Sequence, residues 1–156
     1  MNQEENDEGL LKIQAKEISD LFAMNEGRRP RLLIAAFETV QEKKLLTWAG
    51  LFADLGCNVD IAPYKSKLEH IQRQCVENDT DILLLLTDGF FQNEPWQDFL
   101  TSILTESPHM IAALHTSQSK SSVDLYTYET SWSFFDQDDL PVVIVSTLLK
   151  KLLSEG

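Results

Sequence analysis

Positive charge is scarce in this sequence. Its 13 lysines and arginines stand against 25 aspartates and glutamates, which leaves a formal net charge of -12 over 156 residues. A surface of this sign repels the phosphates of nucleic acids and of anionic membranes, and no stripe of Lys or Arg offsets it locally. We therefore expect neither a nucleic acid nor a membrane as a partner.

Long apolar runs, a basic leader and closely spaced cysteines are also missing. No apolar stretch approaches the roughly 20 residues of a membrane-spanning helix. Residues 1–9 are acidic and polar, whereas a signal peptide needs a basic start and then an apolar run. The two cysteines, Cys57 and Cys75, lack the close spacing of zinc or redox motifs. We predict two buried thiols in a reducing compartment, and hence a cytoplasmic protein.

Continuous apolar runs alternate with segments of helical periodicity along the chain. Runs such as 32–37 are typical of strands buried on both faces of a parallel sheet, and apolar residues three or four apart, as in 45–55, indicate helices. The predicted strands are 32–37, 59–62, 81–86, 110–114 and 123–128. The predicted helices are a leading one that ends near Gly27, 45–55 with Gly56 as its C-cap, 68–75, 95–104, and a last one with Pro141 in its first turn and Asp138 or Asp139 as its cap.

This alternation predicts an α/β fold. Parallel strands joined through helices require right-handed crossovers, and five of them favour a flavodoxin-like doubly wound sheet in the order 2-1-3-4-5 with an extra N-terminal helix. We expect an acidic tail and leading helix over residues 1–26 and the α/β domain over residues 27–156. Such a fold by itself indicates no function.

Three segments resemble one known family in the same order along the chain. They are Gly27-Arg28-Arg29-Pro30-Arg31-Leu32-Leu33-Ile34-Ala35, Ala53-Asp54-Leu55-Gly56-Cys57-Asn58-Val59-Asp60-Ile61-Ala62-Pro63 and Val76-Glu77-Asn78-Asp79. They look like the entry to the first strand, the second strand and the approach to the third strand in the cobalamin-binding domain of methylmalonyl-CoA mutases. The similarity is strong over residues 27–86 and weak afterwards. It implies that residues 27–156 form a cobalamin-binding-like domain.

The residues with which that family holds cobalamin differ in this sequence. The family's Asp-x-His-x-x-Gly, whose histidine ligates cobalt and whose aspartate orients it, falls on Val40 and Glu42, and no histidine occurs before His70. Its Ser-x-Leu, which meets the nucleotide tail, falls on Leu86-Thr87-Asp88. The resemblance therefore implies that the cobalt ligand has been lost.

The glycines that make room for the nucleotide tail are missing as well. The family's Gly-Gly falls near Leu114-His115-Thr116 and its Gly-x-Gly near Tyr128-Glu129-Thr130, and neither place holds a glycine. Side chains should then fill the slot that glycines leave open. The resemblance implies that no cofactor is bound, and it marks as degenerate cofactor-binding positions Val40, Glu42, Thr87, Asp88 and His115.

Several polar and aromatic residues allow a second interpretation of the same edge. Glu38, Glu42, Asp88 and His115 would lie near the carboxyl ends of the strands, where α/β folds bind ligands, and could line a cleft for a small cation. Strand ends are polar in most α/β proteins, so structural roles are the simpler expectation. We also expect His70 to be solvated, Asp136, Asp138 and Asp139 to cap a helix on a solvated face rather than bind metal, and Phe90 and Phe91 to close the vacated cofactor face.

Three hypotheses about function follow. We predict a non-catalytic subunit or regulatory module that pairs with another protein, either a mutase subunit or a second copy, and no catalysis by this chain alone because the mutase substrate barrel is absent. The alternative is a functional cobalamin-binding subunit of an acyl-CoA mutase that needs no protein histidine. A flavodoxin-like receptor such as a response regulator is the third, but the acidic cluster and lysine of a receiver domain are not in place.

Overall fold

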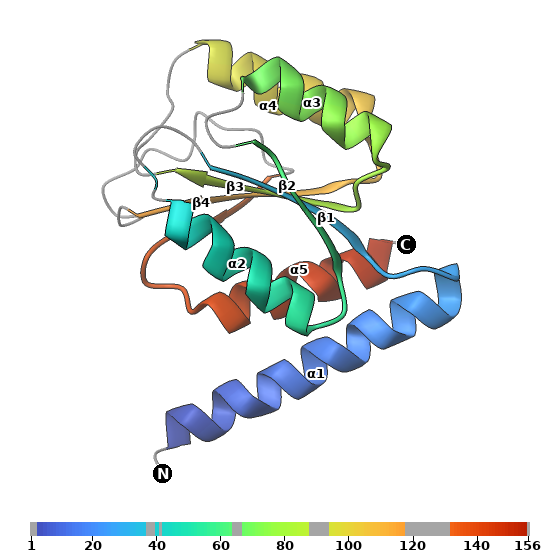
Figure 1. The fold of residues 1–156 in the computed structure, drawn as a ribbon, viewed down its shortest axis with the longest axis vertical. Helices are drawn as coiled ribbons and strands as arrows, with labels where there is room; N and C mark the ends of the chain where they lie inside the picture. The colour runs from blue at the N-terminus through green and yellow to red at the C-terminus, as the bar shows by residue number, and fades with distance from the viewer. Residues whose placement is uncertain are drawn as a thin grey trace.

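A five-stranded parallel sheet with helices on both faces forms the body of the protein (Figure 1). The computed structural model describes residues 3–36, 40, 42–63, 67–87, 94–117 and 132–155. The strands are β1 (Arg31–Ala36), β2 (Asn58–Ile61), β3 (Ile82–Thr87), β4 (Ile111–Thr116) and β5 (Ser133–Phe135). The helices are α1 (Gln3–Glu26), α2 (Glu42–Asp54), α3 (Leu68–Glu77), α4 (Glu94–Glu106) and α5 (Pro141–Glu155).

The strand order confirms the predicted topology. The sheet runs β2-β1-β3-β4-β5, and each neighbouring pair is parallel. This is the flavodoxin-like order, with α1 as the additional N-terminal helix. The order reverses between β1 and β3, so the carboxyl ends of these two strands mark the edge at which doubly wound folds bind ligands.

The fifth strand lies later in the chain than predicted. The strand beside β4 is β5 (Ser133–Phe135), which pairs Leu114 with Phe134 and His115 with Phe135. The predicted strand 123–128 lies outside the described residues. A three-residue strand is too short to show alternation in the sequence, and its aromatic residues suit a strand only because β4 is there to pair with them.

Two hydrophobic cores enclose the sheet. The core on one face combines alternate residues of β1, β3 and β4 with α1, α2 and α5, and the core on the other face combines the remaining strand residues with α3 and α4. Figure 1 shows α3 and α4 on one side of the sheet and the other three helices on the opposite side. All six residues of β3 are buried. Because successive side chains point to opposite faces, this strand needs cover on both.

Helices α1 and α2 end close to the glycines at which the sequence predicts their ends. Gly27 and Gly56 have φ values of +75° and +88°, and each donates a backbone hydrogen bond to the helix before it. This left-handed conformation costs glycine little and other residues more. The predicted cap of α5 is wrong, since the helix begins at Pro141 and the residue before it is Leu140, whose carbonyl accepts the N–H groups of Val143 and Ile144.

A carboxylate joins three elements at the amino end of the sheet. Asp81, just before β3, accepts two hydrogen bonds from the Arg28 guanidinium, at 2.6 and 3.0 Å, and one from the backbone N–H of Arg31 at 2.7 Å. The guanidinium of Arg28 also lies over the ring of Phe22 on α1, 5.3 Å from its centroid. The hydrogen bonds to Asp81 raise the pKa of Arg28. This Asp81 clamp holds the end of α1 and the start of β1 against β3.

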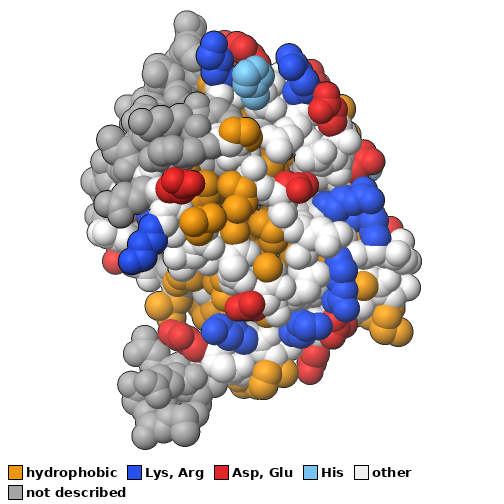
Figure 2. Space-filling model, in the orientation of Figure 1, with side chains coloured by type: hydrophobic (Ala, Val, Ile, Leu, Met, Phe, Trp, Pro, Cys, Tyr) orange, Lys and Arg blue, Asp and Glu red, His pale blue; other side chains and the backbone are white. Residues whose placement is uncertain are grey.

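Charged side chains of both signs surround hydrophobic ones on the face seen in Figure 2. None of the helices within the described residues combines the length and apolar character that crossing a bilayer requires.

The Asp81 clamp generates the first prediction. Asp81→Asn should lower the free energy of unfolding by about 2 kcal/mol, because a half-buried Arg28 loses its charged partner. Urea denaturation measures this loss. Asp98→Asn is the control, since Asp98 is exposed on α4, and it should change stability by less than about 0.5 kcal/mol. Equal losses in the two variants would contradict the clamp.

Candidate functional site

The carboxyl ends of β1, β3 and β4 form the edge where the sequence predicts a vacated cofactor site. Of the five degenerate positions, Val40, Thr87 and His115 are buried, with exposed fractions of 1%, 0% and 4%. Glu42 is exposed as the first residue of α2. Asp88 lies outside the described residues, as do Glu38, Phe90 and Phe91.

The sheet separates the buried positions from one another. His115 follows Ala113 by two residues and therefore shares its face, toward α2 and α5. Thr87 follows Leu85 by two residues and shares the opposite face, toward α3 and α4. The two side chains therefore do not line one surface. Nor do the described members of the predicted acidic cleft share a wet surface, because Glu42 is exposed and His115 is buried.

His115 packs against a tryptophan that the sequence did not link to it. The ring of Trp48, on the inward side of α2, meets the imidazole edge-on with centroids 5.4 Å apart. Trp48 is itself buried, and Phe52 lies one helical turn further along, 6.5 Å from it. The signal was present in the helical stripe of Leu45, Trp48 and Phe52, but the partner on β4 depends on the sheet order. Aromatic rings thus fill this core near the carboxyl end of β4.

Burial keeps His115 neutral. Loss of solvation lowers its pKa to about 4, Lys44 adds to that shift, and Asp139 and Asp136 partly oppose it. Within the part of the chain that the structure describes, the Nδ1 atom of His115 has no hydrogen-bond partner. A neutral imidazole needs fewer partners than an imidazolium, so the environment favours the uncharged ring. At neutral pH this histidine is a packed side chain rather than a cation.

The end of β4 offers no slot beside the backbone. Leu114, His115 and Thr116 are all buried, with exposed fractions of 3%, 4% and 5%. The resemblance implies that the family's Gly-Gly pair would fall near these residues. Side chains of this size exclude a ligand from the strip of backbone that glycines would expose.

The turn after β5 is closed by its own carboxylates. Asp136 Oδ1 accepts the N–H of Asp138 at 2.8 Å, and Asp139 Oδ2 accepts the N–H of Asp136 at 2.9 Å. Asp136 is buried, so the prediction of a solvated face is wrong for this residue. The predicted glycine position 128–130 lies outside the described residues, and the residues that follow the fifth strand are Asp136-Gln137-Asp138, again without glycine.

The remaining titratable candidates are structural. His70 is exposed on α3, as predicted. Burial raises the pKa of the Cys57 thiol to about 11 and that of Cys75 to about 12, so neither is a reactive thiolate at neutral pH. Over the described ranges, no three His, Cys, Asp or Glu side chains are grouped as metal ligands would be.

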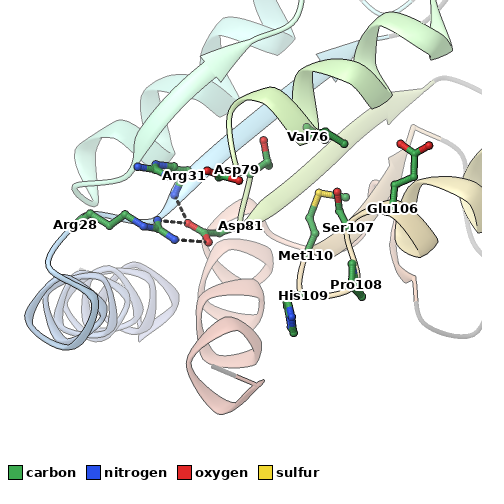
Figure 3. A pocket seen from close by; sticks show the side chains of 12 residues that line it. Arg28, Arg31, Val76, Asp79, Asp81, Glu106, Ser107, Pro108, His109 and Met110 are labelled. Atoms are coloured by element: carbon green, nitrogen blue, oxygen red, sulfur yellow. Dashed lines mark hydrogen bonds and ion pairs between the residues drawn. The ribbon is translucent and has the colours of Figure 1, made fainter.

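A pocket of about 450 Å³ opens at the opposite, amino end of the sheet. Figure 3 shows the Asp81 clamp on one side of it and Glu106, His109 and Met110 on the other. Both arginines that line it are paired, Arg28 with Asp81 at 2.6 Å and Arg31 with Asp79 at 3.8 Å. Their charge is already compensated, so the pocket is a poor anion site despite its arginines. Sequence reasoning missed it because 28–31, 79–81 and 106–110 meet only in the folded chain.

Local sequence similarity links the chain to methylmalonyl-CoA mutases. It is 37% identical over 70 residues to the methylmalonyl-CoA mutase large subunit of Porphyromonas gingivalis, which is 44% of this chain and 10% of that subunit. It is 36% identical over 66 residues to the Escherichia coli methylmalonyl-CoA mutase, covering 42% of this chain and 9% of that protein. The chain thus spans about a tenth of the length of these relatives. No protein-family model matches it.

Solved structures share the fold at low sequence identity. A putative pilus assembly-related protein from Burkholderia pseudomallei matches with a TM-score of 0.61 and 16% identity, over 81% of this chain and 90% of that chain. A response regulator receiver protein from Sinorhizobium medicae matches with a TM-score of 0.58 and 13% identity, over 80% and 94%. These matches support the flavodoxin-like fold and carry no functional assignment.

The burial of His115 generates the second prediction. The folded state keeps the imidazole neutral down to about pH 4, whereas an unfolded chain protonates near pH 6.5. The unfolded state therefore binds more protons between these values, and the free energy of unfolding should fall as the pH drops from about 6.5 to 4. His115→Gln should remove up to about 3 kcal/mol of that fall.

Chemical denaturation at a series of pH values tests this prediction. The quantity to compare is the slope of the free energy of unfolding against pH, not its absolute value. His70→Gln, which changes an exposed histidine, should keep the slope of the unaltered protein. An unchanged slope in His115→Gln would show that carboxylates alone produce the acid sensitivity.

Proposed function

We propose that this chain is a degenerate cobalamin-binding-like domain that acts as a non-catalytic subunit or regulatory interaction module and does not bind cobalamin. The observation that carries the proposal is the filled end of β4, where Leu114, His115 and Thr116 are buried and Trp48 packs on His115. The local similarity to mutase subunits supports descent from a domain of that family.

The residues present do not fit the cofactor. At the position that matches the family's cobalt ligand stands Glu42, an exposed carboxylate. The only histidine within the described part of this edge, His115, is buried and held by packing from α2. A nucleotide tail would have to displace Trp48 and His115 together. Removing such aromatic packing costs several kcal/mol, which binding would have to repay.

The proposed loss of the cofactor leaves the fold intact for a physical reason. Among the described residues, the altered positions Val40, Glu42, Thr87 and 114–116 lie at strand ends or near the start of α2, whereas β3 and the helix faces carry apolar residues. Large side chains in the former slot add burial and remove a cavity. Selection for a stable partner domain would therefore accept these changes, and selection for cofactor binding would not.

Titration of the purified chain with hydroxocobalamin tests the proposal. We expect no saturable change in absorbance and no calorimetric signal at concentrations up to about 100 μM. A cobalamin-binding domain of the mutase family serves as the positive control. A one-to-one complex of low-micromolar affinity, about -8 kcal/mol, would overturn the proposal and favour the carrier alternative.

Restoring the missing ligand alone should not restore binding. Glu42→His supplies an imidazole at the matching position, but the buried side chains of β4 stay in place, so hydroxocobalamin should still fail to bind. Glu42→Gln is the matched control for loss of charge. Saturable binding in Glu42→His, with the altered cobalt spectrum of a histidine ligand and none in Glu42→Gln, would show that the slot is open after all.

A further inference from the structure

Helix α1 has apolar residues on two opposite faces. One face packs on the body of the protein through Ala15 and Phe22, which are buried in the core with α2 and α5. The other face carries four apolar side chains that stay in solvent: Leu10, Ile13, Leu21 and Met24, exposed by 54%, 58%, 43% and 81%. Hydrophobic side chains are visible along the lower border of Figure 2, where α1 runs. A surface helix normally needs only one apolar face.

The spacing of these four residues defines a continuous stripe centred on a charge. Counting from Leu10, the steps to Ile13, Glu17, Leu21 and Met24 are 3, 4, 4 and 3 residues, which keeps them on one side of a helix. Glu17 is exposed in the middle of them. We call these five residues the α1 stripe.

Two grooves flank the α1 stripe, and Glu17 borders both. One, of about 350 Å³, lies between α1 and α2 and is lined by Ile13, Leu51 and Leu55 among others. The second, of about 400 Å³, lies between α1 and α5 and is lined by Ile18 and Leu21. A ridge of apolar side chains with a groove on each side is the shape that an amphipathic helix packs against.

Charge decides which helix fits. The linings of the two grooves carry both signs, with Glu17 and Asp54 beside Lys12, Lys16 and Lys150. The stripe itself carries one charge, the carboxylate of Glu17, and the chain as a whole carries a net charge of -12. Of the nearby bases, Lys16 is paired with Asp20 at 2.7 Å. The net negative charge of the chain disfavours an anionic membrane. A bound helix would need a cation opposite Glu17.

A second copy of this chain is a poor occupant. The stripe is symmetric about Glu17, so an antiparallel pair of α1 helices would place Leu10 against Met24 and Ile13 against Leu21, but also Glu17 against Glu17. Two like charges at the centre of a contact are unfavourable. Two bodies of charge -12 would also repel each other at a distance.

We propose that the α1 stripe docks an amphipathic helix of another protein, with apolar residues at helical spacing and a lysine or arginine opposite Glu17. This inference rests on the proposed interaction role and specifies its partner. The apolar side chains supply affinity, and the cation supplies orientation and selectivity. The site lies on the outer side of α1, away from the edge where cobalamin would bind.

Two designed helical peptides test the proposal by fluorescence anisotropy with the full chain. Both carry the same leucine face, and they differ only in an arginine or a glutamate at the position meant to face Glu17. The arginine peptide should bind about 5- to 10-fold more tightly at low salt. Glu17→Lys should reverse that preference, because it exchanges attraction for repulsion.

Substitutions distinguish binding at the α1 stripe from nonspecific hydrophobic binding. Ile13→Ser with Leu21→Ser should weaken binding of the arginine peptide at least about 10-fold while the thermal unfolding curve stays cooperative. Val76→Ser, which removes a half-exposed apolar residue from α3 on the other side of the sheet, should leave binding unchanged. Equal affinity for both peptides, or equal loss in Val76→Ser, would overturn the inference.

Sedimentation equilibrium of the chain alone gives the remaining outcome. A monomer is expected, and a dimer abolished by Ile13→Ser with Leu21→Ser would replace the proposed partner by a second copy. These results are independent of the cobalamin titration. Loss of the peptide preference would leave the absence of cobalamin binding standing, whereas cobalamin binding would overturn the proposed function whatever the peptides do.

Discussion

The six consecutive buried residues of β3 are the constraint from which the architecture follows. Ile82 to Thr87 alternate between the two faces of the sheet, so each face must be covered by helices if their apolar surface is to leave water. Pairing with β1 on one side and β4 on the other satisfies the backbone of the same strand. The carboxylate of Asp81, directly before β3, anchors the amino end of this strand to the side chain of Arg28 and to the backbone of Arg31. A parallel, doubly wound sheet is the arrangement that meets all of these demands.

The two ends of this sheet differ in chemistry. At the amino end, charges are paired and partly exposed, and the arginines of the pocket are held by aspartates. At the carboxyl end, Leu114, His115 and Thr116 of β4 are buried, Trp48 of α2 packs on His115, and this histidine is neutral. In a ligand-binding α/β domain the carboxyl end is the open one. Here the packing of Trp48 on His115 has made it part of the core.

The proposed loss of a ligand would leave the outer surfaces of the domain in place. The helix faces that cover the sheet are still needed for folding. Helix α1 has in addition a second apolar face that is not part of the core. Exposed apolar groups have a cost in solubility, which the chain offsets with its large negative charge. The proposed partner accounts for both the negative charge and the exposed apolar stripe: the charge selects a cationic partner, and the α1 stripe binds its apolar face.

The sequence by itself determined the extra N-terminal helix, the glycine ends of α1 and α2, and the burial of both cysteines, because each depends on local periodicity or on backbone conformation. The strand order followed from the alternation of strands and helices together with the right-handed crossover rule. It also identified His115 as a residue at a strand end, and it placed the resemblance to mutase subunits within residues 27–86. Only the tertiary structure decided that β5 is Ser133–Phe135, that Trp48 covers His115, that Asp81 joins α1 to the sheet, and that Asp136 is buried. These outcomes depend on contacts between segments far apart in the chain. Local sequence patterns cannot predict such contacts, because the residues that make them become neighbours only in the folded chain.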